Sequence, residues 1–374
     1  MEFKIDKQTF LQGLYKIQGI VDKKSTLNVL SHVLITSTSE GTIRFTSTDY
    51  DVVLLGSYEA EVVKAGSMAV NGRSLFDVVK SLPEETIHLR SLENHWVELK
   101  CGRSRFKLTG IPAEDFPTFQ EDVDLATFKV SKATIRSMID KTAFSVSNDE
   151  SRLNLNGVFF RVQPDGDGNL RLTMASTDGH RLSKVEETIE DSGWEGDAAE
   201  AIIHKKGVFE LKRMLEGTDE DTFIGFHHAN IVFKNDGDTM FVRQIEESFP
   251  DYTKVIPQSN STHLTVPRAM ITNAVRRTAT LTSSKTSIIR LELSPGNLVL
   301  STSNPEAGES RDELDVTYQG ESMAIGFNYR YLLDVLSVVG GDEIRFEIND
   351  QFSPGVIRSE EDANAIFVIM PMRI

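Results

Sequence analysis

Apolar residues follow two kinds of spacing along this chain, and the two kinds alternate in a repeated order. A short segment in which every second residue is apolar begins at Phe3, Phe128 and Leu264. Each segment is followed by apolar residues at every third or fourth position, which is the spacing of an amphipathic helix. Asp6 and Ser131 precede two of these helical runs and are good N-cap residues. The pattern therefore predicts a strand leading into a helix three times.

A second helical pattern follows in each copy, at 73–82, 206–215 and 330–339. The segments between the helical runs alternate apolar and polar residues and end at Gly, Asn or Asp, as strands joined by turns do. The similar phrases EDFPTF and ESFPDY close the first two copies, and the third ends at FVIMPMRI. Landmarks that recur in one order at a near-constant period are typical of homologous domains.

We therefore expect an α+β fold of three tandem homologous domains, each with two helices and antiparallel sheets. The polar stretches QEDVDLA and PQSNSTH separate the copies. The expected domains are 1–121, 127–255 and 262–374.

The net charge of the chain is distributed unevenly among these elements. The chain has 40 Lys and Arg against 56 Asp and Glu, a net charge of −16, which taken whole argues against a nucleic-acid partner. The six helical segments, however, carry a net positive charge, so the remaining segments are more acidic than the chain as a whole. Helices that share one side of the fold would bind a polyanion there by its backbone, without reading bases.

Composition and motifs exclude several classes of protein and of site. Apolar residues make up 39% of the chain, enough for packed cores, and the single cysteine, Cys101, excludes an intrachain disulfide and favours a reducing compartment such as the cytoplasm. No signal-peptide pattern or long apolar span is seen. Phosphate-loop, zinc-protease and nucleophile-elbow motifs are absent, and His227-His228 lacks recognisable metal partners, so we expect no cofactor and no metal.

Two segments keep alternative interpretations open. The run Asp178-Gly179-His180-Arg181 places an acid beside a histidine, which would suit a hydrolase, although no nucleophile accompanies it and a binding role is favoured. The apolar C-terminal run 367–374 is expected to dock as a strand. Its two methionines around a proline suit adaptable recognition, and a plain edge strand explains them equally well.

Several phrases across all three copies resemble the bacterial sliding clamps, the beta subunits of DNA polymerase III. They include GRSRFKL (102–108), STDGHRL (176–182), KKGVFELKRML (205–215), YLLDVL (331–336) and VIMPMRI (368–374). The resemblance implies a head-to-tail homodimer that closes a ring around double-stranded DNA, with helices lining the hole. It also implies a processivity factor without catalytic activity, placed by a clamp loader and bound by the replicative polymerase, other polymerases and repair factors.

The resemblance further implies a peptide-binding groove between the second and third domains. Its expected residues are Leu155, Thr177, Gly179, His180, Arg181, Leu182, Pro250, Lys254, Val255, Asn328, Tyr331, Val368, Ile369, Met370, Pro371, Met372 and Arg373. The chain departs from the family pattern at Lys254, where an Arg is common, at Thr286, a position that can be aromatic, and around Phe352, where the stretch is bulkier than usual.

The same resemblance implies a dimer interface and a DNA-facing surface. The interface would join the strand of Phe106 and Leu108 to the region of Thr280 and Leu281 in the partner subunit. The basic residues expected to face DNA are Lys23, Lys24, Arg73, Arg136, Arg152, Lys205, Lys206, Arg276 and Arg277.

Overall fold

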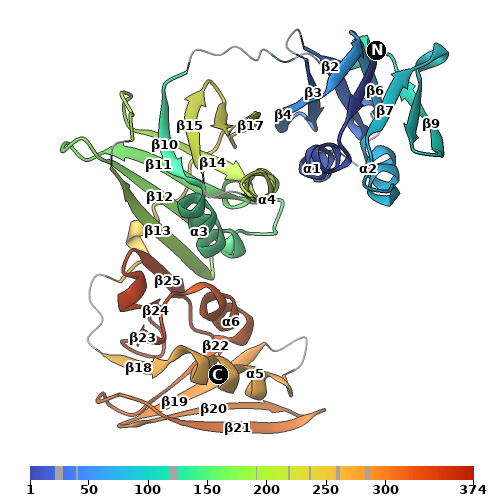
Figure 1. Ribbon diagram of the computed structural model, residues 1–374. Helices are drawn as coiled ribbons and strands as arrows, with labels where there is room; N and C mark the ends of the chain where they lie inside the picture. Colours follow the sequence, from blue (N-terminus) through green and yellow to red (C-terminus); the bar gives the residue numbers. More distant parts are fainter. Residues whose placement is uncertain are drawn as a thin grey trace. The chain divides into compact units, whose positions relative to one another are not determined.

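A computed structural model describes residues 1–21, 28–38, 41–117, 119, 125–190, 192–217, 220–235, 237–257, 262–282 and 287–374 (Figure 1). These residues form two compact units. The first comprises Met1–Ala133, Asp191–Gly196 and Lys206–Gln244, and the second comprises Thr134–Glu190, Asp197–Lys205 and Ile245–Ile374. The division passes through the central repeat because some of its strands continue the sheet of the first repeat and others continue a sheet of the third.

The helices confirm the prediction of two per repeat. The described residues contain α1 (Lys7–Ile17), α2 (Gly72–Ser81), α3 (Lys132–Thr142), α4 (Lys205–Met214), α5 (Arg268–Ala279) and α6 (Tyr329–Val338). Asp6 caps α1, since its carboxylate accepts hydrogen bonds from the backbone N–H groups of Gln8 and Thr9 at 2.9 and 3.2 Å. The α+β class and the antiparallel strand pairing are as the sequence predicts.

One sheet of thirteen strands runs through the first unit. Its order is β10 (Thr127–Ser131), β15 (Asp221–His227), β16 (Asn230–Lys234), β17 (Asp238–Arg243), β4 (Val52–Glu59), β3 (Thr42–Thr48), β2 (His32–Ser37), β6 (Ser67–Asn71), β9 (Ser104–Ile111), β8 (Trp96–Cys101), β7 (Ile87–Ser91), β1 (Glu2–Ile5) and β5 (Glu61–Lys64). The sheet passes from the central repeat to the first repeat where β17 pairs with β4. We call this pairing the first junction.

The first junction is apolar on one face and carries an ion pair. Val53 and Leu55 of β4 pack with Val232 and Phe241 in one buried cluster. Lys16, at the end of α1, pairs with the carboxylate of Asp238 at the start of β17, and the two side chains are 15% and 3% exposed. Apolar burial and one buried charge pair therefore join the two repeats.

Helix α1 packs very closely on its sheet at Gly13. A Cβ at this position would stand 2.7 Å from the ring of Tyr58 and 2.9 Å from the ring of Phe45. Phe10, Leu14 and Ile17 are fully buried beside it, at the spacing that predicted the helix. Glycine therefore sets the distance between this helix and the sheet.

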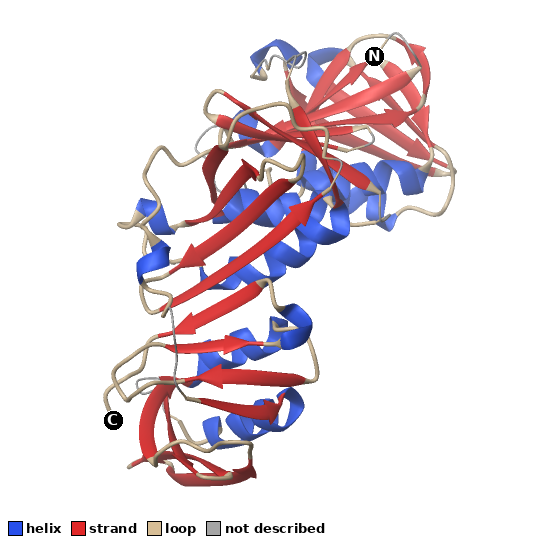
Figure 2. Ribbon diagram, turned by 90° about the vertical axis from the view of Figure 1, so that its left-hand side faces the viewer, coloured by secondary structure: helices blue, strands red, loops and turns tan. Residues whose placement is uncertain are grey.

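Two sheets make up the second unit. The eight-stranded sheet has the order β14 (Ala199–His204), β11 (Gly157–Pro164), β12 (Leu170–Thr177), β13 (Arg181–Ile189), β25 (Ala365–Ile369), β24 (Gly355–Arg358), β23 (Glu343–Glu347) and β18 (His263–Pro267). The four-stranded sheet has the order β21 (Gly308–Asp315), β20 (Asn297–Asn304), β19 (Ile288–Ser294) and β22 (Met323–Asn328). Figure 2 shows the helices of this unit along one face of the sheets.

The eight-stranded sheet crosses from the central repeat to the third where β13 pairs with β25, which we call the second junction. The pairing runs from Arg181 opposite Ile369 to Val185 opposite Ala365. Lys141 of α3 pairs with Asp362 at 2.5 Å across the same two repeats. Because β25 is hydrogen-bonded to both β13 and β24, residues 367–369 of the C-terminal run lie in an interior strand. This confirms that the run docks in a sheet and makes the edge-strand interpretation wrong.

Candidate functional site

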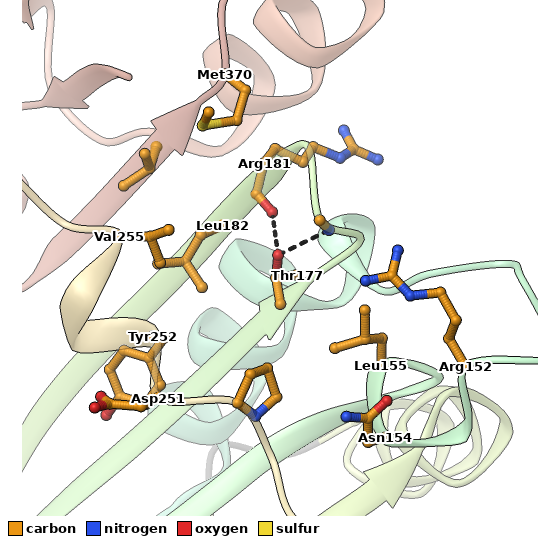
Figure 3. Close-up of a pocket in the computed structure, with 13 residues that line it drawn as sticks. Arg152, Asn154, Leu155, Thr177, Arg181, Leu182, Asp251, Tyr252, Val255 and Met370 are labelled. Carbon is orange, nitrogen blue, oxygen red and sulfur yellow. Dashed lines mark hydrogen bonds between the residues drawn. The ribbon is translucent and has the colours of Figure 1, made fainter. Parts of the chain in front are cut away.

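A groove lies in the second unit, beside the second junction (Figure 3). Its volume is about 260 Å³. The lining residues are Arg152, Asn154, Leu155, Thr177, Gly179, Arg181, Leu182, Pro250, Asp251, Tyr252, Val255, Val368 and Met370. Apolar side chains with a few polar groups at the rim suit the binding of a short peptide.

The turn between β12 and β13 forms one wall. The hydroxyl of Thr177 donates to the backbone oxygen of Arg181 at 2.6 Å and accepts from the N–H of Gly179 at 3.0 Å. Gly179 has φ +91°, in the left-handed region that favours glycine. This turn is thereby fixed, and Leu182 begins the paired part of β13 on the groove floor.

The opposite wall is the segment after the Phe249-Pro250 phrase. Tyr252, in a 3-10 turn (Tyr252–Lys254), packs against two buried clusters, one around Phe159 and one around Val368. Burial raises the pKa of the Tyr252 hydroxyl, so the ring stays neutral. Asp251 accepts hydrogen bonds from Thr253, which together with its ion pair to Lys254 lower the pKa of its carboxyl group.

The C-terminal strand completes the groove. Val368 of β25 pairs with Leu182, and the backbone N–H of Met370 donates to the oxygen of His180 at 2.8 Å. The next residues turn away, since the N–H of Met372 donates to the oxygen of Gly326 at 2.8 Å. Residues 371–374 line a second cavity, which they share with Phe352, whose side chain is 71% exposed.

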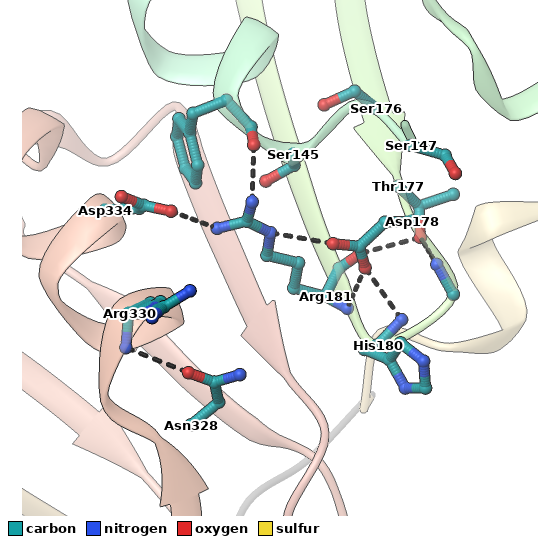
Figure 4. Close-up of polar contacts among 12 residues, drawn as sticks. Ser145, Ser147, Ser176, Thr177, Asp178, His180, Arg181, Asn328, Arg330 and Asp334 are labelled. Atoms are coloured by element: carbon teal, nitrogen blue, oxygen red, sulfur yellow. Dashed lines mark hydrogen bonds and ion pairs between the residues drawn. The ribbon is translucent and has the colours of Figure 1, made fainter. Parts of the chain in front are cut away.

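Arg181 connects the groove to helix α6 (Figure 4). Its guanidinium donates to Asp178 at 3.0 Å, to Asp334 at 2.5 Å and to the backbone oxygen of Phe144 at 2.6 Å. It also lies 4.4 Å from the ring centroid of Tyr331, the pKa of which is raised by burial and then by the charge of Asp178. A planar group with five donors is suited to hold three elements together.

The structure brings together part of the predicted groove. Nine of the predicted residues line it, namely Leu155, Thr177, Gly179, Arg181, Leu182, Pro250, Val255, Val368 and Met370. Tyr331 contacts the lining residue Arg181 with its ring. Asn328 is the N-cap residue of α6. Ile369 is fully buried, whereas His180, Lys254, Met372 and Arg373 are exposed and Pro371 is half-buried. Thr286 lies outside the described residues.

Sequence reasoning missed three lining residues, Asn154, Asp251 and Tyr252, and assigned Arg152 to another surface. Tyr252 and Asp251 follow Pro250 in the ESFPDY phrase, so their place in a repeated phrase was the available signal. Arg152 was assigned to the DNA-facing surface under the family resemblance. Its guanidinium donates to the backbone oxygen of Asp178 at 3.3 Å.

The run around Asp178 has no catalytic arrangement. The Oδ1 atom of Asp178 accepts from the backbone N–H groups of His180 and Arg181 at 2.9 and 3.0 Å, and Oδ2 accepts from the Arg181 side chain. The carboxylate therefore closes a turn instead of orienting the imidazole, as a hydrolase would require. Within the described ranges, no group of three or more His, Cys, Asp or Glu side chains is placed to hold a metal ion.

The basic residues predicted to face DNA differ in how they are held. Arg73 of α2 and Arg276 of α5 are exposed, and Arg136 of α3 is half-buried. Lys205 donates to Asn148 at 2.7 Å. Two others are ion-paired, Lys206 with Asp49 and Arg277 with Asp312. Lys23 and Lys24 lie outside the described residues.

The residues predicted for the dimer interface lie at two places with open hydrogen-bonding groups nearby. Phe106 and Leu108 are half-buried on β9, whose residues 104–109 pair with β8 alone in the described sheet. Thr280 and Leu281 follow α5, and in the same repeat β21 is the edge of its sheet. Unpaired strand edges are common docking surfaces.

Comparison with known proteins gives a consistent result along the whole chain. Three families match, described as the DNA polymerase III beta subunit N-terminal domain (residues 1–120), central domain (129–251) and C-terminal domain (253–373). No helix in the described ranges has the length and apolar character needed to cross a membrane.

Relatives and solved structures agree with the families. The chain is 34% identical to the beta sliding clamp of Pseudomonas aeruginosa and 32% identical to that of Escherichia coli K12, each over the full length of both chains. A crystal structure of the DNA polymerase III subunit beta from Pseudomonas aeruginosa superposes with a TM-score of 0.91, and a sliding clamp from Bartonella birtlesii bound to griselimycin, 31% identical, superposes with 0.93. Both structures are covered completely.

Proposed function

Because the chain belongs to the DNA polymerase III beta subunit family and is a processivity clamp of DNA replication, we propose that it closes a ring around double-stranded DNA as a head-to-tail homodimer. In this proposal the clamp works in the cytoplasm, is placed by a clamp loader and has no chemistry of its own. The proposed domains are 1–121, 127–255 and 262–374, and replicative polymerases and repair factors bind by short peptides.

One observation carries the tethering part of the proposal, namely the groove beside the second junction. Its floor is apolar at Leu155, Leu182 and Val368, and Met370 adds a flexible thioether that adapts to different side chains. Arg181 and Tyr252 are fixed by their own contacts, so a peptide meets a preformed surface. Preformed pockets bind with a smaller loss of conformational entropy.

Two strand edges of opposite charge support the head-to-tail ring. The strand β9 carries Arg105 and Lys107 without an acid, whereas β21 carries an excess of acidic residues including Glu309 and Asp312. A partner subunit that set its β21 against β9 would pair open backbone groups and opposite charges together. Phe106 and Leu108 would be covered by the region of Thr280 and Leu281 in the partner subunit. Such a contact is heterologous and closes after two subunits.

The DNA-facing surface is proposed on the helices, from Lys23, Lys24, Arg73, Arg136, Lys205, Lys206, Arg276 and Arg277. Arg136 and Arg276 have no acidic partner within the described residues, so their charges are the most available to phosphate. Arg152 is kept in the proposal for the groove, because its guanidinium contacts the turn there.

A topological experiment tests the ring. The clamp, loaded on closed circular DNA, should remain bound through gel filtration and should be lost once the circle is cut with a restriction enzyme. Equal retention on both forms would contradict encirclement. Solution mass should be that of a dimer at micromolar concentration, and a strict monomer would contradict the head-to-tail contact.

A second experiment tests the groove separately. Met370→Ala and Tyr252→Ala should each weaken a clamp-binding peptide of the replicative polymerase by about tenfold in fluorescence anisotropy, because each removes an apolar contact. Phe223→Ser, which changes an exposed aromatic side chain of β15 that does not line the groove, is the control and should bind as the unchanged chain does. Unchanged affinity in both groove variants would contradict the assignment, while dimer mass should stay constant.

A further inference from the structure

Another cavity lies in the first unit, beside the first junction. Its volume is about 390 Å³, and three aromatic side chains, Tyr50, Phe119 and Phe241, contribute to its wall. It shares no described lining residue with the groove. Its position in the repeats shows what it corresponds to.

The turn that borders this cavity corresponds to the turn of the groove. The Ser-Thr-Asp phrase that ends β3 aligns with the one that ends β12, which places Tyr50 at the position of Gly179 and Val53 at that of Leu182. All four residues line their respective cavities. The two sites are therefore built on the same turn in successive repeats.

The remaining walls correspond as well. Phe119 ends the phrase FPTF as Tyr252 ends the phrase FPDY, and each lines its cavity. Across the junctions, Phe241 pairs with Val53 in the register in which Val368 pairs with Leu182. The cavity is thus the counterpart of the groove at the other junction.

The two sites differ in where they place a guanidinium group. Arg243 occupies the place of Met370, two residues beyond the paired strand position. His227 and His228 lie beside it, with ring centroids 4.2 Å apart, and no Asp or Glu is among the described lining residues. Aromatic walls with an arginine at one side are complementary to an aromatic side chain that stands next to a carboxylate.

The backbone gives a second reason to regard this cavity as a site. Tyr50 has φ +75° and His228 has φ +51°, both in the left-handed region that side chains other than glycine rarely adopt. Gly179 has φ +91° at the corresponding position, so the conformation belongs to the turn and the tyrosine is held there against its preference. Strained residues of this kind concentrate at ligand sites.

We propose that the cavity at the first junction is a second peptide site, which takes a segment with an aromatic residue flanked by carboxylates. The proposal rests on the proposed function, because the correspondence is drawn with the groove. It differs in occupant, since the groove takes apolar clamp-binding peptides and this site takes acidic ones.

The test uses the full chain and a fluorescein-labelled peptide that contains the run Asp-Trp-Asp, with a matched peptide in which both acids are Asn. The acidic peptide should bind saturably, and the amide peptide about tenfold more weakly, because charge-assisted contacts are lost. Tyr50→Gly and Arg243→Met should each weaken the acidic peptide by a similar factor. Both variants introduce the residue found at the corresponding position, so their backbones are expected to fold unchanged, and thermal unfolding checks this.

Three results with the peptides would overturn the proposal. They are no saturable binding to the folded chain, equal binding of the acidic and amide peptides, and loss of acidic-peptide binding in Met370→Ala, which would place the probe in the groove. Tighter binding of a single-stranded oligonucleotide that displaces the probe would likewise assign the cavity to nucleic acid instead. Failure of the polymerase peptide to bind, with the acidic peptide still bound, would contradict the groove and leave this site supported.

Discussion

The two junctions show how one scaffold is used in two ways. Each joins successive repeats through five paired residues of antiparallel strands, and each adds a lysine at the same position of the leading helix. Lys16 pairs with Asp238 at the first junction and Lys141 pairs with Asp362 at the second, with all four side chains at least 85% buried. At both places a lysine from the same helix position forms a buried ion pair with an aspartate of the next repeat, although the two aspartates stand at different positions.

The junctions differ in the partner of an acidic residue on the second helix of the later repeat, which is α4 at the first junction and α6 at the second. Glu210 of α4 pairs with Arg213 in its own helix, whereas Asp334, at the corresponding place in α6, pairs with Arg181 of the neighbouring repeat. Each junction has a second cross-repeat ion pair, Lys206 with Asp49 at the first and Asp334 with Arg181 at the second, and the latter also shapes the groove. The first junction has Val52 at the place of Arg181, and both junctions have a buried apolar cluster.

The third repeat completes the comparison. Arg277 holds the position of Lys16 and Lys141, yet its partner Asp312 lies in the same repeat and the guanidinium is 59% exposed. Arg277 therefore pairs within its own repeat, whereas Lys16 and Lys141 each pair with the next repeat. The contact proposed between subunits would lack this buried pair, and we expect it to be the weaker one.

The largest effects are expected from the helix cations. Lys16→Met and Lys141→Met should each lower the free energy of unfolding by about 3 kcal/mol, because a buried aspartate is left without its partner. Arg277→Met should cost less than about 1 kcal/mol, since that pair is largely exposed. Urea denaturation measures the loss in free energy of unfolding for each variant. Hydrogen exchange in β17 and β25 shows whether the loss is at the junction strands. Equal losses in all three variants would show that the junctions are not specially fastened.

Arg181→Met should have the next largest effect. It should lower the free energy of unfolding by about 2 kcal/mol. The Arg181 side chain is only 10% exposed, so Asp178 and the backbone oxygen of Phe144 would lose hydrogen bonds that water replaces poorly. Arg181→Lys should restore part of the loss, since the charge returns without the planar fork. Full recovery with lysine would show that charge alone matters there.

Exchanging the turn residues should have a smaller effect. Gly179→Tyr should cost about 1 kcal/mol through its left-handed backbone and should weaken polymerase-peptide binding, since a Cβ there stands 3.0 Å from the Arg152 guanidinium. Tyr50→Gly should change the free energy of unfolding by less than about 1 kcal/mol. Thermal unfolding and anisotropy measure both. A harmless Gly179→Tyr would mean that the two turns are interchangeable.

The smallest effect is expected from pH at the first junction. Burial raises the pKa of Glu210, with Arg213 and Lys206 opposing the shift. Its protonated form is therefore favoured by folding, and this share of stability is fully present below about pH 4.3 and is lost as pH rises through the raised pKa. The difference in urea midpoint between the unchanged chain and Glu210→Gln should vary with pH in that window. A constant difference would contradict the shift.

The fold could be read from the sequence because its signals are local. Asp6 caps α1 with its own carboxylate, and the spacing of Phe10, Leu14 and Ile17 is the spacing of one buried helix face. Six helices followed from such patterns in the described chain. The joining of sheets did not, because the pairing of β4 with β17 depends on residues nearly two hundred positions apart and has no local signature.

The candidate site was predictable to a different extent. Leu155, Thr177 and Leu182 lie in phrases that resemble a known family, and the structure places all three on the groove. Arg152 was assigned to the DNA-facing surface but lines the groove, since a basic residue in a loop gives no indication of which surface it reaches. The pairing of Lys16 with Asp238 was equally out of reach, because neither residue stands in a distinctive motif.

The shared sheets have a consequence for the assembly of the polypeptide. A repeat excised from the chain would expose the backbone edge of β4 or β17 in one case and of β13 or β25 in the other. Exposed edges recruit other strands, so separately produced repeats should aggregate or recombine with one another. Since the closing strand of each junction is synthesised long after its partner, the early edges need protection during translation, and folding is expected to be slow.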